Sequence, residues 1–475
     1  MPLNMRTVSL RNIPCVCLIG IYIFMWLTRI GLLGLVLMEA WIPLAHAQFP
    51  AFGSADDPRE VITAYWWSRE HFIIPQNGLS LIERQLRIAI GVQAEGTARS
   101  FIYRWKGIVR TGIFGFYRPD TDEWYDGIRT IRFIRYRPPE DVPFYLRIGG
   151  ISRMRFGSGH LVNFYSSIVS WDKRTIGIET AFTYPELQIG YFTDDLRVNR
   201  VMGLYLSLLP LARIKPLSPL WQSLEIHFAS ASDRTSVGRG HRLTGYHTEA
   251  SINLLDPSTG FFFRPYFSFA KFISYGSGIA IGLRTGSANL SDAVRLHLQL
   301  TLFYNSRYFI PGYFNTFYRI NNGVERIIDA DTYISHGRFR PIGITLEEAR
   351  GGSDLLHELR VLFFGRFELW YQFKRHYGTQ KLSSFHFFFF LYPRGDNRLR
   401  FEWNLHRTGL TSFLSIFSKL RNQHTLKFAI AYRYRGNLWL SLATRYTYRP
   451  VQENNRYFIV QRRFEPMLSL RIRFL

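Results

Sequence analysis

Apolar and polar side chains alternate in segments of about ten residues that recur through most of this chain. In the clearest segment, residues 426–434, every second side chain is apolar or aromatic, and those between them are Lys427, Ala429, Ala431 and Arg433. Because successive side chains of a β-strand point to opposite faces, a period of two predicts a strand. A strand with one apolar face needs two environments, which lipid outside a closed barrel and water inside it provide.

Other segments repeat this alternation. Residues 296–302 and 399–405 carry only apolar side chains on one parity and polar ones on the other. Gly436-Asn437 joins residues 426–434 to the apolar segment 438–448, as a hairpin turn would. Weaker alternation occurs at 84–94, 107–117, 144–155, 174–183, 186–193, 221–231, 246–256 and 277–285. We predict an all-β fold, a closed antiparallel transmembrane β-barrel of roughly 18 strands, an even number between about 14 and 22.

The last segment of the chain has the same two faces. Ser469, Arg471 and Arg473 alternate with an apolar set, Leu468, Leu470, Ile472 and Phe474. This segment resembles the C-terminal strand of bacterial outer-membrane β-barrels, which commonly ends in an aromatic residue, although here Phe474 is penultimate. The resemblance implies that the apolar set is an assembly signal and that the barrel assembly machinery is a partner. It also implies a location in the outer membrane of a bacterium with two membranes.

The first 47 residues have the features of a signal peptide. Basic residues and apolar runs precede a cleavage motif of small residues, which predicts cleavage between Ala47 and Gln48 with Ala45 and Ala47 as the recognised positions. Because residues 25–47 form a complete signal by themselves, Met25 is an alternative start of translation. A retained anchor at residues 13–26 is the other alternative, but it is short against about 20 residues per membrane span.

Two stretches interrupt the alternation. Residues 48–80 are irregular, and Asp57-Pro58-Arg59-Glu60 has the order of an N-cap and first helical turn, which predicts a short helix to about residue 69. The barrel then spans residues 81–475. A second stretch, at about 305–355, predicts a long loop with one or two helical turns near Thr345–Glu348. We expect this loop to be exposed, with a fold into the pore as the alternative.

The composition agrees with a barrel. Hydrophobic residues make up 47% of the chain and aromatic residues 17%. After Ala47, however, no apolar run approaches the roughly 18 residues of a spanning helix. Strands that face lipid on one side and water on the other account for both observations.

The net charge indicates which side chains line the lumen. Lys and Arg total 59 against 35 Asp and Glu, a net charge of +24, and removal of residues 1–47 (three Arg, one Glu) leaves +22. We expect no nucleic-acid partner, because secretion separates the chain from nucleic acid. The basic residues lie mostly opposite the apolar parity, and the pore-lining candidates are Arg147, Arg153, Arg155, Arg295, His297, Arg398, Arg400, Lys427, Arg433, Arg471 and Arg473. Such a lumen favours anions. Structural ion pairs, or contacts of rim cations with anionic lipopolysaccharide, are the alternatives.

Catalytic and metal signatures are weak. Phe156-Gly-Ser-Gly-His160 brings a serine and a histidine together, but its glycines indicate a turn or bulge. The histidines have no metal-binding spacing, and both cysteines lie within the predicted signal peptide. We expect no enzyme activity, no catalytic residues, no metal and no cofactor.

The sequence therefore predicts an outer-membrane channel for passive or facilitated diffusion of small, anionic solutes. One alternative is a barrel subunit or scaffold of an envelope assembly, secretion or surface-polymer export system. A secreted soluble all-β protein is the second. Outer-membrane lipid and lipopolysaccharide are expected partners. An oligomer is also possible, because residues 387–390 are apolar on both faces, as at a contact between subunits.

Overall fold

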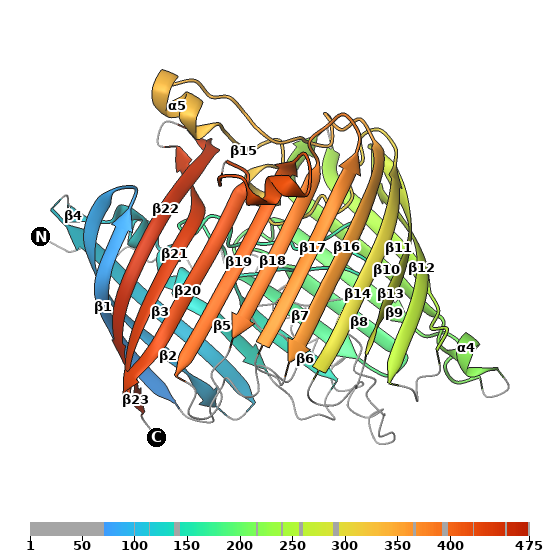
Figure 1. The fold of residues 1–475 in the computed structure, drawn as a ribbon, viewed down its shortest axis with the longest axis horizontal. Helices are drawn as coiled ribbons and strands as arrows, with labels where there is room; N and C mark the ends of the chain where they lie inside the picture. Colours follow the sequence, from blue (N-terminus) through green and yellow to red (C-terminus); the bar gives the residue numbers. More distant parts are fainter. Residues whose placement is uncertain are drawn as a thin grey trace, which may run out of the picture. The chain divides into compact units, whose positions relative to one another are not determined.

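One antiparallel sheet, closed on itself, makes up most of the protein (Figure 1). The computed structural model describes residues 71–473 except 99, 114, 137–142, 215–216, 239–240, 256–259, 288–293, 364–366, 392–397, 421 and 452–453. The predicted signal peptide with its cleavage site, the helix expected before residue 69, and Phe474 lie outside the described residues.

Twenty strands form the wall. They are β1 (Phe72–Ile82), β2 (Gln85–Ala98), β3 (Phe101–Gly112), β5 (Ile131–Tyr136), β6 (Phe144–Gly149), β7 (Gly177–Thr183), β8 (Leu187–Thr193), β9 (Val201–Leu208), β10 (Glu225–Gly238), β11 (His241–Ser251), β12 (Phe261–Phe272), β13 (Ser277–Ser287), β14 (Val294–Asn305), β16 (Gly352–Phe363), β17 (Phe367–Tyr377), β18 (Ser383–Leu391), β19 (Leu399–Leu410), β20 (His424–Arg435), β21 (Leu438–Val451) and β22 (Asn454–Leu470). The short strands are β4 (Gly115–Phe116), β15 (Arg326–Ile327) and β23 (Ile472–Arg473). The described helices are η1 (Arg118–Asp120), α3 (Tyr125–Arg129), α4 (Pro219–Gln222), η3 (Tyr318–Ile320), α5 (Ala330–His336) and η4 (Leu414–Phe417).

The two ends of the sheet meet at β1. This strand pairs with β2 on one side and with β22 and β23 on the other, so that Phe72 lies opposite Arg473 and Ile82 opposite Arg463. Each wall strand is antiparallel to its neighbours, while the short β15 lies parallel to β22. Closure leaves the wall without an unpaired edge. Among the described residues, no helix is long and apolar enough to cross a bilayer.

The strand prediction needs two corrections. The barrel has 20 strands, an even number within the predicted range but above 18. It also begins at Phe72 instead of residue 81, because the Pro75-Gln76-Asn77-Gly78 stretch of β1 interrupts the alternation. Gly78 fits this position because a Cβ there would lie 2.2 Å from the backbone oxygen of Pro466 on the adjacent strand. The close approach of the two strands favours glycine at this position. The glycine interrupts the alternation of apolar and polar residues from which β1 could have been predicted.

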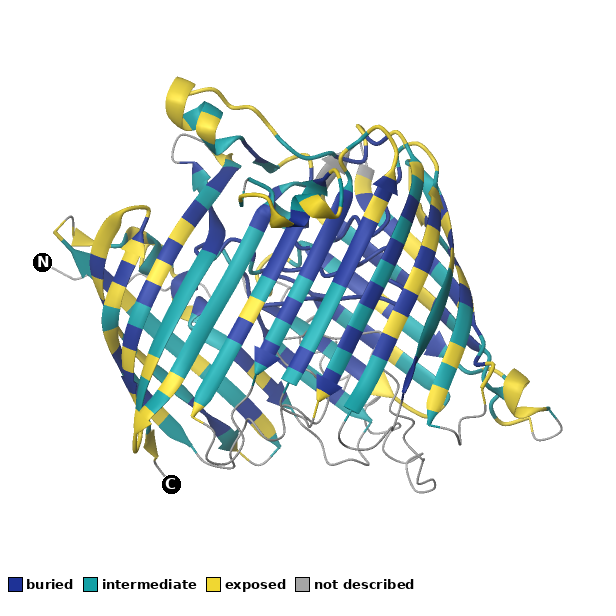
Figure 2. Cartoon of the chain, viewed as in Figure 1, coloured by how far each residue is buried: buried dark blue, intermediate teal, exposed yellow. Residues whose placement is uncertain are grey.

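Exposed and buried residues alternate along most wall strands (Figure 2). Leu468, Leu470 and Ile472 are on the outer face together with the exposed leucines of β14, of which Leu300 is 51% exposed. The opposite parity is mostly buried inside the barrel. An apolar outer band around a polar interior is the arrangement of a lipid-embedded barrel.

The longest connections lie at one end of the barrel. Residues 150–176 and 306–351 connect strands at the end opposite the described C-terminus, where Figure 1 also places α5. Outer-membrane barrels have their longer loops outside the cell and their shorter turns in the periplasm. The end with α5 is therefore extracellular, and the end at β23 is periplasmic.

Two connections fold into the lumen. Nearly all side chains of residues 150–176 and of residues 309–322 are buried. The segments join at the parallel bridge between Val162 and Phe314 and at the hydrogen bond from Gly312 N to His160 O, 2.8 Å long. The expectation of an exposed loop at 305–355 is thus wrong for its first part, whereas α5 is largely exposed. The strand predicted at 144–155 ends at Gly149 for the same reason.

Candidate functional site

The inward segments bury one side of the lumen and leave the other accessible. On the filled side, the side chains of Arg155 and Glu358 are only 9% and 1% exposed. Lumen side chains on β19, β20 and the end of the chain keep more contact with solvent: Arg400 is 30%, Lys427 32% and Arg471 28% exposed. The lumen is therefore more accessible around Arg400, Lys427 and Arg471, whereas the lumen side chains of β1–β3 and β22 are mostly buried.

Three wall carboxylates on this side each contact two cations. Glu95 is bound by Arg104 (3.0 Å) and Arg471, Glu402 by Lys427 and Arg400 (4.0 Å), and Glu465 by Arg110 (2.6 Å) and Arg445. Arg110, near the extracellular end of β3, places the Glu465 cluster highest. Glu95 and Glu402 are near the periplasmic ends of β2 and β19. Cations thus outnumber carboxylates at Glu95 and Glu402. Arg110 is shared between Glu465 and Asp120, so the charges of that cluster balance.

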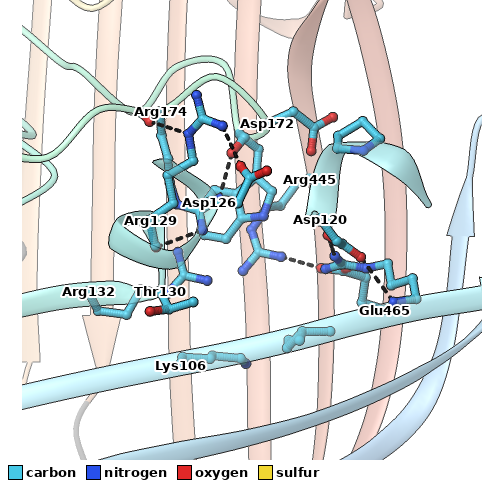
Figure 3. A pocket seen from close by; sticks show the side chains of 14 residues that line it. Lys106, Asp120, Asp126, Arg129, Thr130, Arg132, Asp172, Arg174, Arg445 and Glu465 are labelled. Carbon is cyan, nitrogen blue, oxygen red and sulfur yellow. Dashed lines mark hydrogen bonds and ion pairs between the residues drawn. The ribbon is translucent and has the colours of Figure 1, made fainter. Parts of the chain in front are cut away.

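A small pocket beside Glu465 adds further cations (Figure 3). Its cavity of about 50 Å³ is lined by Lys106 of β3, Arg132 of β5, Arg174 of the inward segment and Arg445 of β21. In the part of the chain that the structure describes, neither Lys106 nor Arg132 forms an ion pair. The pocket has room for a few waters or a small anion.

Trp171 holds three of these like charges together. The guanidinium carbons of Arg445, Arg132 and Arg174 lie 4.1, 4.6 and 4.8 Å from the centre of its ring. Cation–π attraction offsets part of their mutual repulsion. Arg174 is fixed further, because it donates to the backbone oxygens of Trp171 (2.7 Å) and Arg129 (2.9 Å). The indole thus keeps three guanidinium groups clustered at the cavity.

Four carboxylates also line this pocket, those of Asp120, Asp126, Asp172 and Glu465. Asp120 of η1 accepts from Arg110 Nη1 (2.6 Å) and from the Arg110 backbone N (3.0 Å). Burial raises the pKa of Asp120 to about 6, although the neighbouring Arg110 guanidinium opposes the shift. Asp172 is paired with Arg463 and accepts from Tyr117 Oη (2.7 Å). Burial acts to raise the pKa of Asp172, but the charge of Arg463 and the hydrogen bonds from Tyr117 and Arg463 together lower it.

Several sequence-predicted lumen residues are buried and stabilise the inward segment. Arg155 donates to both oxygens of Glu358 (2.6 and 2.7 Å) and to Gln299 Oε1 (2.8 Å). Arg153 lies 4.4 Å from the ring centre of Phe388 on β18. Arg147 donates to Gly150 O at 3.1 Å, and His297 is buried beside Phe262. These four lie away from the accessible lumen.

The other predicted residues divide between the charged clusters and the periplasmic end. Arg400, Lys427 and Arg471 belong to the clusters around Glu402 and Glu95. The remaining four lie near the periplasmic strand ends: Arg295 is partly buried, Arg398 precedes β19, Arg433 donates to Gly436 O (2.6 Å), and Arg473 is in β23.

Sequence reasoning missed Lys106, Arg110, Arg132, Arg445 and Trp171. The parity of β21 could have identified Arg445, since it shares a face with Ser441 and Ala443 while Leu440 and Leu442 occupy the other. The register of β3 was harder, because the predicted segment 107–117 starts after Lys106 and runs past the end of the strand at Gly112. No local signal places Trp171 at the wall.

Catalytic geometry is not evident. His160 Nδ1 lies 2.9 Å from Ser268 Oγ, but both residues are fully buried and pack among aromatic rings. In the described ranges, no group of three His, Cys, Asp or Glu side chains is placed to hold a metal ion.

The closed wall of 20 strands, its apolar outer band and its polar interior define an outer-membrane β-barrel protein. No family model matches the sequence, and no curated protein does either. Among solved structures, the siderophore receptor PirA of Pseudomonas aeruginosa is similar, with 9% identity over 86% of this chain and 81% of that chain and a TM-score of 0.34. OpdQ of the same species matches with 10% identity, 86% and 99% coverage and a TM-score of 0.32. OccAB3 of Acinetobacter baumannii matches with 10% identity, 85% and 98% coverage and a TM-score of 0.30. At these values the similarities carry no argument about the substrate.

Proposed function

We propose that the protein is an outer-membrane channel for small anionic solutes. The observation that carries the proposal is an excess of cations on this side of the lumen. Glu95 and Glu402 are each paired with two cations. Among the described residues, Lys106 and Arg132 form no ion pair. A lumen lined by unneutralised positive charge raises the local concentration of anions and opposes cations.

The arginine side chains of the lumen favour oxyanions among the possible anionic solutes. The guanidinium group presents a rigid fork of donors that fits phosphate, sulfate and carboxylate, and it stays charged when partly desolvated. Arg132, Arg174 and Arg445 around Trp171 place three such forks at one cavity. An anion that enters from the extracellular side would meet this group before the clusters at Glu402 and Glu95.

A second function is supported by the filled side of the lumen. The buried segments 150–176 and 309–322 occupy space that an open pore would leave to water. A barrel that serves as a subunit or scaffold of an envelope system requires no permanent passage, so this function is the alternative. Conductance of the folded protein separates the two.

The channel proposal is tested by ion selectivity in planar bilayers. Reconstituted protein is expected to conduct chloride in preference to potassium, and the double variant Lys106→Gln/Arg132→Gln should lower the permeability ratio by about threefold to tenfold, the effect of roughly 0.6–1.4 kcal/mol of lost attraction. The matched control is Arg338→Gln/Arg340→Gln, which removes the same charge from an exposed extracellular segment. Cation selectivity would contradict the proposal, and absence of conductance from a folded barrel would favour the scaffold.

Asp120 gives the selectivity a pH dependence. Because its pKa is raised to about 6, the carboxyl group is ionised at pH 7 and largely neutral at pH 5. Protonation removes one negative charge beside Arg110, so anion preference should increase as the pH falls through about 6. Reversal potentials measured from pH 7 to pH 5 check this. Asp120→Asn should show, at both pH 7 and pH 5, the selectivity that the wild type reaches at pH 5. A pH step in that variant as large as in the wild type would show that another group titrates.

A further inference from the structure

Exposed cations gather at the extracellular rim, where β14 and β17 end and β16 begins. They are Arg307, Arg350, Arg375 and Lys381. We propose that this cluster binds the phosphate groups of anionic lipid in the outer leaflet of the outer membrane. The lumen plays no part in this interaction, so it is independent of what the barrel transports.

The position of the cluster relative to the membrane follows from the outward-facing side chains on its periplasmic side. On β17, Phe367, Leu369, Tyr371 and Phe373 occupy the outward parity, and Arg375 is the first charge above them. On β14 the outward leucines end at Tyr304, and Arg307 follows the strand. Both strands thus change from apolar to cationic at their extracellular ends, which is the level of lipid headgroups.

Backbone contacts bring the four residues into one cluster although they come from three parts of the chain. Tyr308 N donates to Ala349 O at 3.0 Å, which places Arg307 near Arg350. Arg350 N donates to Gln380 Oε1 at 2.9 Å, and Gln380 Nε2 donates to Glu348 O at 2.7 Å, which ties the turn carrying Lys381 to the same segment. The cations are therefore held together by the fold.

Tyrosines orient two of the guanidinium groups. Arg307 lies 4.6 Å from the ring centre of Tyr308, and Arg375 lies 5.0 Å from that of Tyr377. Tyr304 and Tyr377 are 53% and 51% exposed at this rim. Tyrosine is favoured at membrane interfaces because its ring is apolar and its hydroxyl is polar. Aromatic anchors and stacked arginines in one place are suited to a headgroup that carries phosphate.

The charges of the cluster are not neutralised by the protein. Among the described residues, none of the four cations forms an ion pair with a carboxylate. The nearby acids have other partners: Glu347 accepts from Tyr275 Oη (3.3 Å), and Glu348 is paired with Arg326 (3.5 Å) and accepts from Thr345 N (2.9 Å). A cluster of exposed cations without carboxylate partners attracts anions such as phosphate groups.

The experiment uses the full protein in nanodiscs of zwitterionic phosphatidylcholine, titrated with bisphosphorylated lipid A. Binding is expected to be tight in low salt and to weaken as salt rises. Arg307→Gln/Arg375→Gln should lower the affinity about 10- to 30-fold, since each cation near an anionic surface contributes roughly fivefold. The control Arg338→Gln/Arg340→Gln should bind as the wild type does.

If the variant assembles poorly, the wild-type protein alone can be compared in its binding of phosphorylated and phosphate-free lipid A. Lipid A from which both phosphates have been removed should bind at least tenfold more weakly, and free inorganic phosphate at millimolar concentration should compete poorly, because it lacks the acyl chains that place the headgroup at the rim. Equal binding of the phosphorylated and phosphate-free lipids would overturn the proposal. So would equal affinity of the wild type and a correctly folded Arg307→Gln/Arg375→Gln variant.

Discussion

Replacement of Glu358 by alanine is expected to destabilise the folded barrel by about 3–5 kcal/mol and to increase its conductance. In a buried environment, Glu358 accepts two hydrogen bonds from Arg155, one from Trp370 Nε1 (3.0 Å) and one from Gln372 Nε2. Its removal leaves the guanidinium of Arg155 buried without its carboxylate. A buried guanidinium without a carboxylate is unfavourable, so Arg155 should move to solvent. Because Arg155 belongs to the inward segment 150–176, this movement should release the segment from the wall.

Unfolding by urea in detergent micelles measures the stability, and planar-bilayer recordings measure the conductance. The matched variant is Arg155→Met/Glu358→Met, since replacement of both members of a buried pair by apolar groups of similar size is often neutral. It should recover most of the stability that Glu358→Ala loses. A double variant as unstable as the single one would mean that Glu358 acts through Trp370 and Gln372 instead of through Arg155.

The second large effect concerns the lipid-facing wall. Leu300 lies near the centre of β14, faces outward and is 51% exposed. An arginine at the middle of the bilayer costs about 2–4 kcal/mol, whereas the cost falls to roughly 0–1 kcal/mol near the interfaces. Leu300→Arg should therefore reduce the folded fraction strongly, and Leu296→Arg, on the same face near the periplasmic end, should reduce it only slightly. Heat-modifiable gel migration gives the folded fraction, and equal effects would contradict the assigned membrane position.

The wall was predictable wherever its two faces meet different surroundings. On β14 and β20, lipid selects apolar residues on one parity while the lumen accepts polar ones, so the sequence alternates. Strand β1 lacks this signal at Pro75–Gly78, where the approach of β22 requires a residue without a side chain. Where the alternation is interrupted in this way, a strand cannot be recognised from the sequence, and the predicted 18 strands fall short of the observed 20.

The inward segments could not be predicted from local patterns. Residues 150–176 contain many polar side chains, and a polar segment without alternation usually indicates an exposed loop. Their burial depends on partners far away in the sequence, such as Glu358 for Arg155, 203 positions apart. The same limit applies to the candidate site: parity placed Arg400, Lys427 and Arg471 inside, but the grouping of three arginines around Trp171 is a tertiary contact.

The partners of segment 150–176 also determine the order in which the molecule can be completed. Each wall strand pairs with its neighbour along the chain, apart from the short β4 and β15, so the wall can grow hairpin by hairpin through contacts of small sequence separation. The segment instead bonds to β16 through Arg155, to β17 through Asn163 and to β22 through Asp172, whose partner Arg463 is 291 positions away. We therefore expect the packing of this segment to be completed only when β22 is in place, after the other hairpins of the wall have formed.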